Sequence, residues 1–74
     1  MTKFPSITGG QLIRALSKLG FETLRTKGSH HFLHHPDGRC TVVPVHRGEN
    51  IGRGLLAQIM RDCEVSRDEL QRML

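Results

Sequence analysis

The sequence of 74 residues is short enough to be one domain, and we expect residues 1–74 to form it. A chain of this size buries only about 60% of the surface of its unfolded state, which excludes a deep substrate cavity and a separate cofactor domain. Eleven Lys and Arg against seven Asp and Glu give a formal net charge of +4, which favours an anionic partner such as nucleic acid.

The N-terminal part of the chain predicts one helix. Residues 1–7 are expected to be a short lead-in, because Pro5 disfavours helix in the residue before it. Thr8 is a suitable N-cap, and Gly20 can end a helix in the left-handed conformation. Residues 8–19 between them carry apolar side chains at helical spacing: Leu12, Ile13, Ala15, Leu16 and Leu19.

The middle of the chain predicts three strands and two turns. Residues 21–26 and 30–35 can form strands that are joined by a turn at residues 27–29. Pro-Asp-Gly at residues 36–38 is a strong turn signal, and residues 39–45 are rich in β-branched side chains. These two hairpins form a three-stranded antiparallel meander.

The C-terminal part predicts two further helices after a loop at residues 46–52. The first has an apolar stripe that we expect in the core, formed by Leu55, Leu56, Ile59 and Met60. Ser66 and Glu69 match a capping box, which starts a last helix that ends at Leu74. The order α-β-β-β-α-α predicts an α+β fold in which the helices pack on one face of the sheet and leave the other face in water.

The second predicted strand divides its side chains between these two faces. One side carries His30, Phe32 and His34, and the other side carries His31, Leu33 and His35. We expect the side with Leu33 to face the core, so His30 points outward on the open face, at the start of the strand. In the alternative assignment the side with Phe32 faces the core, and His30 then points inward as well.

Four of the five histidines lie within residues 30–35, and three interpretations compete. An imidazole titrates at about pH 6.5 and can act as the general acid or base in RNA cleavage. Histidines two residues apart on a strand can also bind Zn²⁺, but no nearby Cys, Asp or Glu completes an obvious set of four ligands. Spacing alone favours the third interpretation, in which these are polar residues of a small sheet.

Two neighbouring segments also allow more than one interpretation. Gly28 in the Lys27-Gly28-Ser29 turn is explained by a tight hairpin, which is the simpler interpretation. Alternatively it lets a phosphate backbone approach closely, with Lys27 as its charge partner. His46 follows the third strand and is a second acid or base, a partner contact or a solvated residue.

The two cysteines, Cys40 and Cys63, do not have the spacing of a zinc site. The sequence contains no signal peptide and no apolar run that could span a membrane. We therefore expect free, partly buried thiols in a cytoplasmic protein without a membrane partner. Three phenylalanines are its only aromatic residues, which argues against an aromatic platform for stacking bases.

Two segments resemble the HicA (YcfA-like) mRNA interferase toxins: RTKGSHHFLHHP at residues 25–36 and TVVPVHRGENIGRGLLAQIM at residues 41–60. That family combines a G-S-H motif at the start of strand two with a V-P-x-H segment at the end of strand three. A Gly-Thr-Leu-like start to the second helix completes the pattern, and the resemblance covers residues 8–74.

The resemblance implies a double-stranded-RNA-binding-domain-like fold, a toxin that cleaves mRNA, and a HicB-like antitoxin partner, with a hetero-oligomer as one form of the complex. We expect cleavage without a metal or other cofactor. It places the catalytic histidine at His30. We expect Lys27, Gly28, Ser29 and His46 to bind substrate. A non-catalytic RNA-binding module of the same fold is the alternative.

The chain departs from the family pattern in two places. Gly54-Leu55-Leu56 stands where the family has Gly-Thr-Leu, so any contact of that hydroxyl is lost. Glu64 stands where a glycine usually follows the second helix, which predicts a different cap there. Neither departure affects the proposed catalytic residue.

Overall fold

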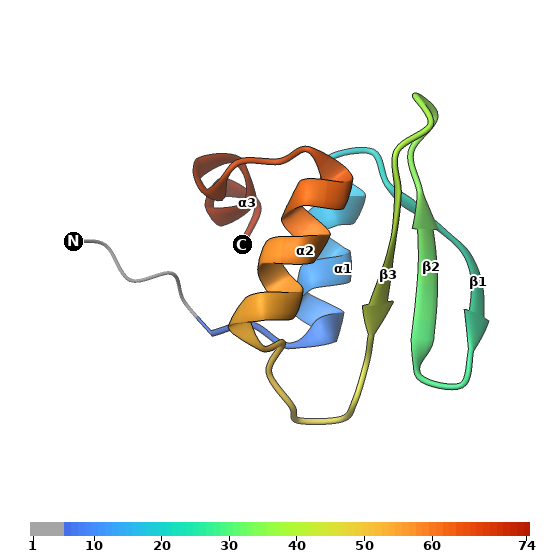
Figure 1. The fold of residues 1–74 in the computed structure, drawn as a ribbon, viewed down its shortest axis with the longest axis vertical. Helices are drawn as coiled ribbons and strands as arrows, with labels where there is room; N and C mark the ends of the chain where they lie inside the picture. The colour runs from blue at the N-terminus through green and yellow to red at the C-terminus, as the bar shows by residue number, and fades with distance from the viewer. Residues whose placement is uncertain (1–5) are drawn as a thin grey trace.

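The computed structural model describes residues 6–74, so most of the predicted lead-in, Pro5 included, lies outside the described residues. Its elements follow the predicted order and form an α+β fold (Figure 1). They are α1 (Gly9–Lys18), β1 (Glu22–Lys27), β2 (His30–His34), β3 (Cys40–Pro44), α2 (Arg53–Cys63) and α3 (Arg67–Met73). No helix among residues 6–74 is both long enough and apolar enough to cross a membrane.

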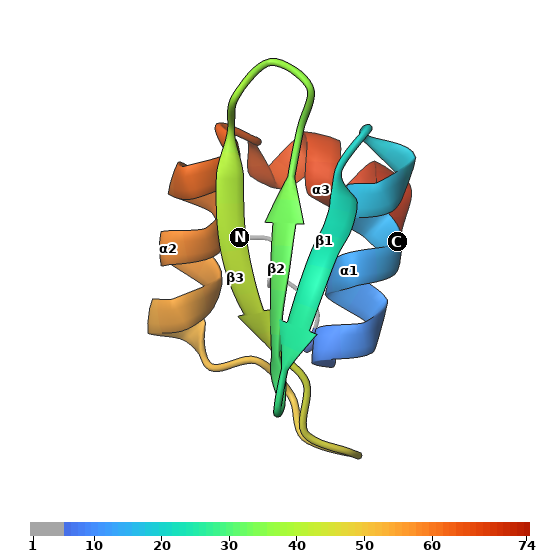
Figure 2. The same cartoon turned by 90° about the vertical axis from the view of Figure 1, so that its right-hand side faces the viewer.

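The three strands form one antiparallel sheet in the order β1-β2-β3. The helices lie behind one face of this sheet, and the opposite face is open to solvent (Figures 1 and 2). The register places Leu33 of β2 between Thr23 of β1 and Thr41 of β3. It shifts between Thr23 and Arg25, so Leu24 forms a bulge in β1. The helices on one face and the open opposite face confirm the predicted layering.

Local signals define the ends of α1. The Thr8 hydroxyl accepts a hydrogen bond from the Gln11 backbone N–H at 3.2 Å, and the Gln11 side chain accepts one from the Thr8 N–H at 2.9 Å. This capping box satisfies donors that the first turn of a helix leaves free. Gly20 has a φ of 101°, and the following Phe21 N–H donates back to the Leu16 carbonyl. Both predicted ends of the helix are therefore confirmed.

Leu33 lies in the core with 1% of its surface exposed, together with residues from all three helices and β3. Ile7 joins them at 3% exposed, and its carbonyl accepts a hydrogen bond from the Ile51 N–H at 2.7 Å. Residues that the sequence assigned to a lead-in and a loop thus hold each other in place. The prediction of a merely connecting segment is wrong at Ile7.

The second helix departs from expectation at both ends. Ile59 is buried, but Leu55 is 39% exposed, so the predicted apolar stripe is not wholly in the core. Glu64 ends the helix with a φ of 54° in the left-handed conformation. The expected different cap is therefore wrong, because Glu64 takes the conformation that a glycine adopts more easily.

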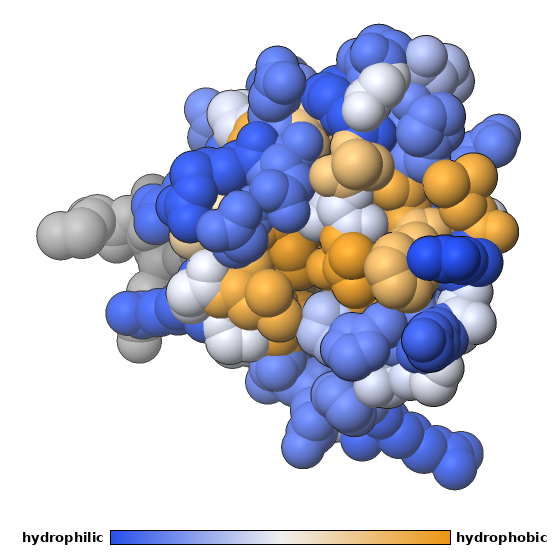
Figure 3. All heavy atoms as spheres, turned by 45° about the vertical axis from the view of Figure 1, so that its right-hand side comes forward, coloured by the Kyte–Doolittle hydropathy of each residue, from blue (hydrophilic) through white to orange (hydrophobic). Residues whose placement is uncertain are grey.

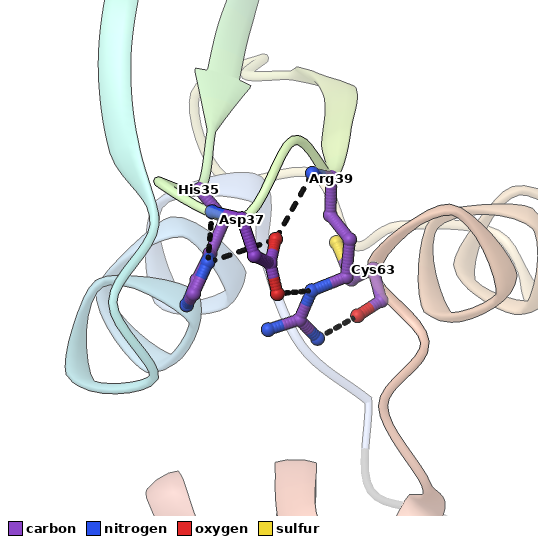
Figure 4. A network of polar contacts seen from close by, with 4 residues as sticks. All are labelled: His35, Asp37, Arg39 and Cys63. Atoms are coloured by element: carbon purple, nitrogen blue, oxygen red, sulfur yellow. Dashed lines mark hydrogen bonds and ion pairs between the residues drawn. The ribbon is translucent and has the colours of Figure 1, made fainter.

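The hairpin between β2 and β3 is fastened to the C-terminal end of α2 by a polar network (Figure 4). Arg39 donates from Nε to Asp37 at 2.8 Å and from Nη1 to the Cys63 carbonyl. Its guanidinium carbon lies 5.2 Å from the centre of the Phe21 ring. The His35 ring packs edge-on against the same phenylalanine at 5.0 Å. We call these five residues the hairpin clamp.

Hydrogen bonding within the hairpin clamp shifts the ionisation of Asp37. The backbone N–H of Arg39 donates to its carboxylate at 3.1 Å, which lowers the pKa of Asp37 below its usual value. The Nδ1 atom of His35 lies 2.9 Å from the same carboxylate. A neutral His35 ring accepts there from the Asp37 N–H at 3.1 Å, and a protonated ring can donate to the carboxylate instead.

The two cysteines have different surroundings. Cys63 is completely buried at the end of α2, and this burial raises the pKa of its thiol to about 11. Cys40 lies exposed at the start of β3. Both thiols are free, but the expectation that each is partly buried is wrong.

Candidate functional site

His30 is the first residue of β2, and its side chain is exposed on the open face of the sheet. It lies opposite Lys27 of β1 and Pro44 of β3. Because alternate residues of a strand face opposite sides, the burial of Leu33 on the helical side directs His30 outward. This confirms the predicted orientation over the alternative with Phe32 inward.

The turn that precedes His30 leaves its backbone accessible. Lys27 and His30 are paired, so Gly28 and Ser29 alone form the turn between the strands. Gly28 has a φ of 59°, and nothing lies within 4 Å of the position that a Cβ would take there. The glycine is therefore required by its backbone conformation, and the space above it is free for a ligand to approach.

His46 is brought to the same end of the sheet by the backbone. The Ser29 carbonyl accepts a hydrogen bond from the Val45 N–H at 2.7 Å, which ties the turn to the residue before His46. The His46 side chain is exposed. Among residues 6–74 no hydrogen bond joins the side chains of His30 and His46, so they share a region without forming a bonded pair.

Two of the remaining histidines have structural surroundings. His31 is half-buried on the helical side, where its Nδ1 atom lies 3.4 Å from the Thr26 hydroxyl. His35 belongs to the hairpin clamp. His34 is half-buried on the open face, opposite Cys40 and Glu22. In the described part of the chain, no three His, Cys, Asp or Glu side chains gather as a possible metal-binding group.

Positive charge exceeds negative charge at this end of the molecule, where Glu49 is the acidic residue of the loop after β3. The β1–β2 turn, the loop after β3 and the start of α2 all lie there (Figure 1). Lys27, Arg47 and Arg53 are exposed on these segments, and none of them forms an ion pair within residues 6–74. Arg47 and Arg53 are site residues that were not predicted from the sequence. Their positions beside His46 and at the start of a helix were the available signal.

The arrangement combines an exposed imidazole, an open glycine turn and three cations on an unobstructed surface. An imidazole can accept or donate a proton. Cations and free backbone groups bind phosphate oxygens. The end of the sheet can therefore hold a polyanion and move a proton on it.

Comparison with known proteins identifies one family. A family model described as "HicA toxin of bacterial toxin-antitoxin" matches residues 9–65, which is more than half of the chain and includes β1 to α2 entirely. No curated protein matches the chain.

Proposed function

Since this chain belongs to the HicA family and is a toxin of the bacterial toxin–antitoxin type, we propose that it is an endoribonuclease that cleaves mRNA with His30. One observation carries the proposal beyond the family assignment. His30 is an exposed histidine on the open face, directly after a glycine turn that leaves room for a phosphate.

The proposed chemistry moves two protons at the scissile phosphodiester, one from the 2′-hydroxyl and one to the departing 5′-oxygen; His30 transfers one of them and water the other. As a base, His30 takes the proton from the 2′-hydroxyl, whose oxygen attacks the phosphorus. As an acid, it protonates the departing 5′-oxygen. General acid–base catalysis by one group contributes about 10²–10⁴-fold. We propose that the reaction uses no metal ion or other cofactor. A modest rate is sufficient for a toxin that arrests growth.

Binding in this proposal comes from the phosphate backbone. Lys27 supplies charge beside His30, Gly28 and Ser29 let the backbone approach, and His46 contacts the neighbouring nucleotide from the loop after β3. Such contacts do not read the base sequence, and they weaken with salt because bound phosphates release counterions.

Control of the activity is proposed to come from a second protein. In the described part of the chain no segment covers His30, which is exposed. We therefore propose a HicB-like antitoxin that covers the open face in a hetero-oligomer, acting in the cytoplasm where the mRNA is. An apolar centre at Phe32, flanked by His30 and His34, supports this site of contact.

The direct test is cleavage of a synthetic mRNA by purified His30→Ala. We expect cleavage to fall at least about 100-fold, while the melting temperature and RNA affinity stay close to wild type. His34→Ala, two residues further along the same face, is the matched control and should retain cleavage. A folded His30→Ala variant that cleaves like the wild type contradicts the assignment.

The alternative function is a non-catalytic RNA-binding module, which the basic end of the sheet also supports. In that case the wild-type protein binds the same RNA without shortening it, and His30→Ala changes only a local contact.

A separate test concerns the metal independence of the proposed cleavage. We expect the wild-type protein to cleave the RNA equally well in the presence of EDTA.

A further inference from the structure

An apolar groove lies on the outer side of the molecule, between α2 and the open face of the sheet. Its volume is about 670 Å³, and each of the four elements around it contributes an apolar wall. These walls are Leu24 of β1, Phe32 of β2, Val42 of β3 and Leu55 of α2. Figure 3 shows apolar side chains gathered across this side of the molecule and bordered by hydrophilic ones. We call this feature the outer groove.

The walls of the outer groove are unusually exposed for large apolar side chains. Leu24 is 66% exposed, Leu55 is 39% and Val42 is 36%. Among the described residues 6–74, only Leu74 also belongs to this class. Three of the four therefore gather in one place, and the bulge in β1 brings Leu24 there as an extra residue. Contiguous apolar surface of this kind marks an interaction site.

Binding of RNA does not account for the outer groove. Aliphatic walls offer nothing to a phosphate, and nucleobases stack on flat aromatic rings. Among the described residues, Phe32 is the only one with a ring that lines the groove, and the Arg25 guanidinium lies 4.8 Å from its centre. The groove therefore suits a protein segment better than a nucleic acid.

The shape of the surroundings favours a helix over an added strand. A strand needs a free and regular sheet edge. The edge at β1 is interrupted by the Leu24 bulge, and α2 packs beside β3 at the other edge (Figure 2). Three strands spaced about 4.8 Å apart and a neighbouring helix about 10 Å away give a length of roughly 20 Å. Nearly four turns of an amphipathic helix span that length.

Charge indicates the kind of protein that supplies this helix. Arg25 and Lys27 lie on the open face beside the groove, because they are paired with Phe32 and His30. Asp62 is the acidic residue of the lining, and its two oxygens accept hydrogen bonds from Thr41 and Gln58. A second copy of this chain, with a formal net charge of +4, is repelled, whereas an acidic protein is attracted.

We propose that the outer groove binds an amphipathic helix of an acidic protein that inhibits the toxin. This inference rests on the proposed function, since it names the surface through which the inhibitor is held. Phe32 lies two residues from His30 on the same face, a distance of about 7 Å along a strand. A helix seated in the groove therefore also stands in the path of RNA to His30.

The test uses the protein encoded by the reading frame adjacent to the toxin gene, co-purified with this chain. Leu55→Glu and Leu24→Glu each place a carboxylate in the apolar contact, and we expect the complex to dissociate about 100-fold more readily. Leu74→Glu is the matched control, because Leu74 is 45% exposed but lies outside the groove. We expect it to leave the affinity of the complex unchanged. All three free variants should cleave RNA like the wild type.

Three outcomes overturn the proposal. The first is a stable wild-type complex whose affinity is unchanged in both groove variants. This result refutes the outer groove as the binding site of the inhibitor, but it does not affect the proposed RNA cleavage by His30. The second is a dimer of the isolated chain in sedimentation that Leu55→Glu abolishes, which assigns the groove to a second copy. The third is no complex with the wild type, which refutes the inhibitor, whereas the cleavage assay tests His30 separately.

Discussion

Replacing Arg39 by Ala should destabilise the fold strongly, although its side chain is partly exposed. The side chain holds the β2–β3 hairpin against the end of α2 through the Cys63 carbonyl (Figure 4). It also lies over the face of the Phe21 ring. Truncation removes both contacts at once. It also removes the ion pair with the exposed Asp37, which contributes little because solvent screens it.

The size of the effect follows from these contacts. A partly buried carbonyl that loses its donor costs about 1–3 kcal/mol, and the lost cation–π contact costs about 0.5–1 kcal/mol. A loss of about 2–4 kcal/mol is a large part of the roughly 4–11 kcal/mol that stabilises a domain of this length. The corresponding decrease in melting temperature is about 10–25 °C.

Urea unfolding followed by circular dichroism measures this loss as a shift of the midpoint at constant slope. Asp37→Asn is the matched control, since it changes the ion pair but keeps the Arg39 contacts to Cys63 and Phe21. We expect a much smaller shift for it. The reasoning is refuted if Arg39→Ala unfolds at the wild-type midpoint, or if Asp37→Asn is equally destabilising.

Three further predictions concern the helix cap, the cysteines and RNA binding. Glu64→Gly should raise the unfolding free energy by about 0.5–1 kcal/mol in urea unfolding, because Glu64 holds a left-handed conformation that costs a glycine little; a loss of stability contradicts this. At pH 8 a thiol reagent should titrate Cys40 quickly in the folded protein and Cys63 only after unfolding. Burial raises the pKa of Cys63 from 9.0 to about 11, so the folded state favours the neutral thiol over the thiolate. The contribution of this thiol to the free energy of unfolding is therefore fully present below pH 9 and is lost as the pH rises through 11. This amounts to about 2–3 kcal/mol, and Cys63→Ala should remove that part of the alkaline slope. If Lys27, Arg47 and Arg53 each contact one phosphate, log affinity for single-stranded RNA should fall with log salt at a slope of about −2, and a flat response argues against phosphate contacts.

Elements whose signals are local could be predicted from the sequence. The capping boxes at Thr8 and Ser66 join residues three apart, and Gly20 acts through its own backbone. The outward orientation of His30 follows from strand alternation once Leu33 is assigned to the core. In each case the residues that interact are near neighbours in the sequence, so the pattern contains the whole interaction.

The rest depends on contacts between distant segments. Leu55 fits the apolar stripe of α2 as well as Ile59 does, and only the position of β3 relative to the helix decides which one is covered. The sequence of β1 contains no glycine that would indicate the bulge at Leu24. Arg39 meets Cys63 across 24 residues, and a lone arginine in a turn gives no indication of that partner.

The two ends of the sheet differ in how they are held, and this separates stability from chemistry. At one end the β2–β3 hairpin is fixed to α2 by Arg39, so side chains there are held by several partners. At the other end the Gly28-Ser29 turn is tied to the loop after β3 by a hydrogen bond from Val45, and His30 stays exposed. In the proposed function the site admits a long polymer, which needs this openness, and the firmly held end of the sheet keeps so small a domain folded. Substitutions at Arg39 should therefore lower activity only through unfolding, whereas substitutions at His30 should lower it in a protein that remains folded.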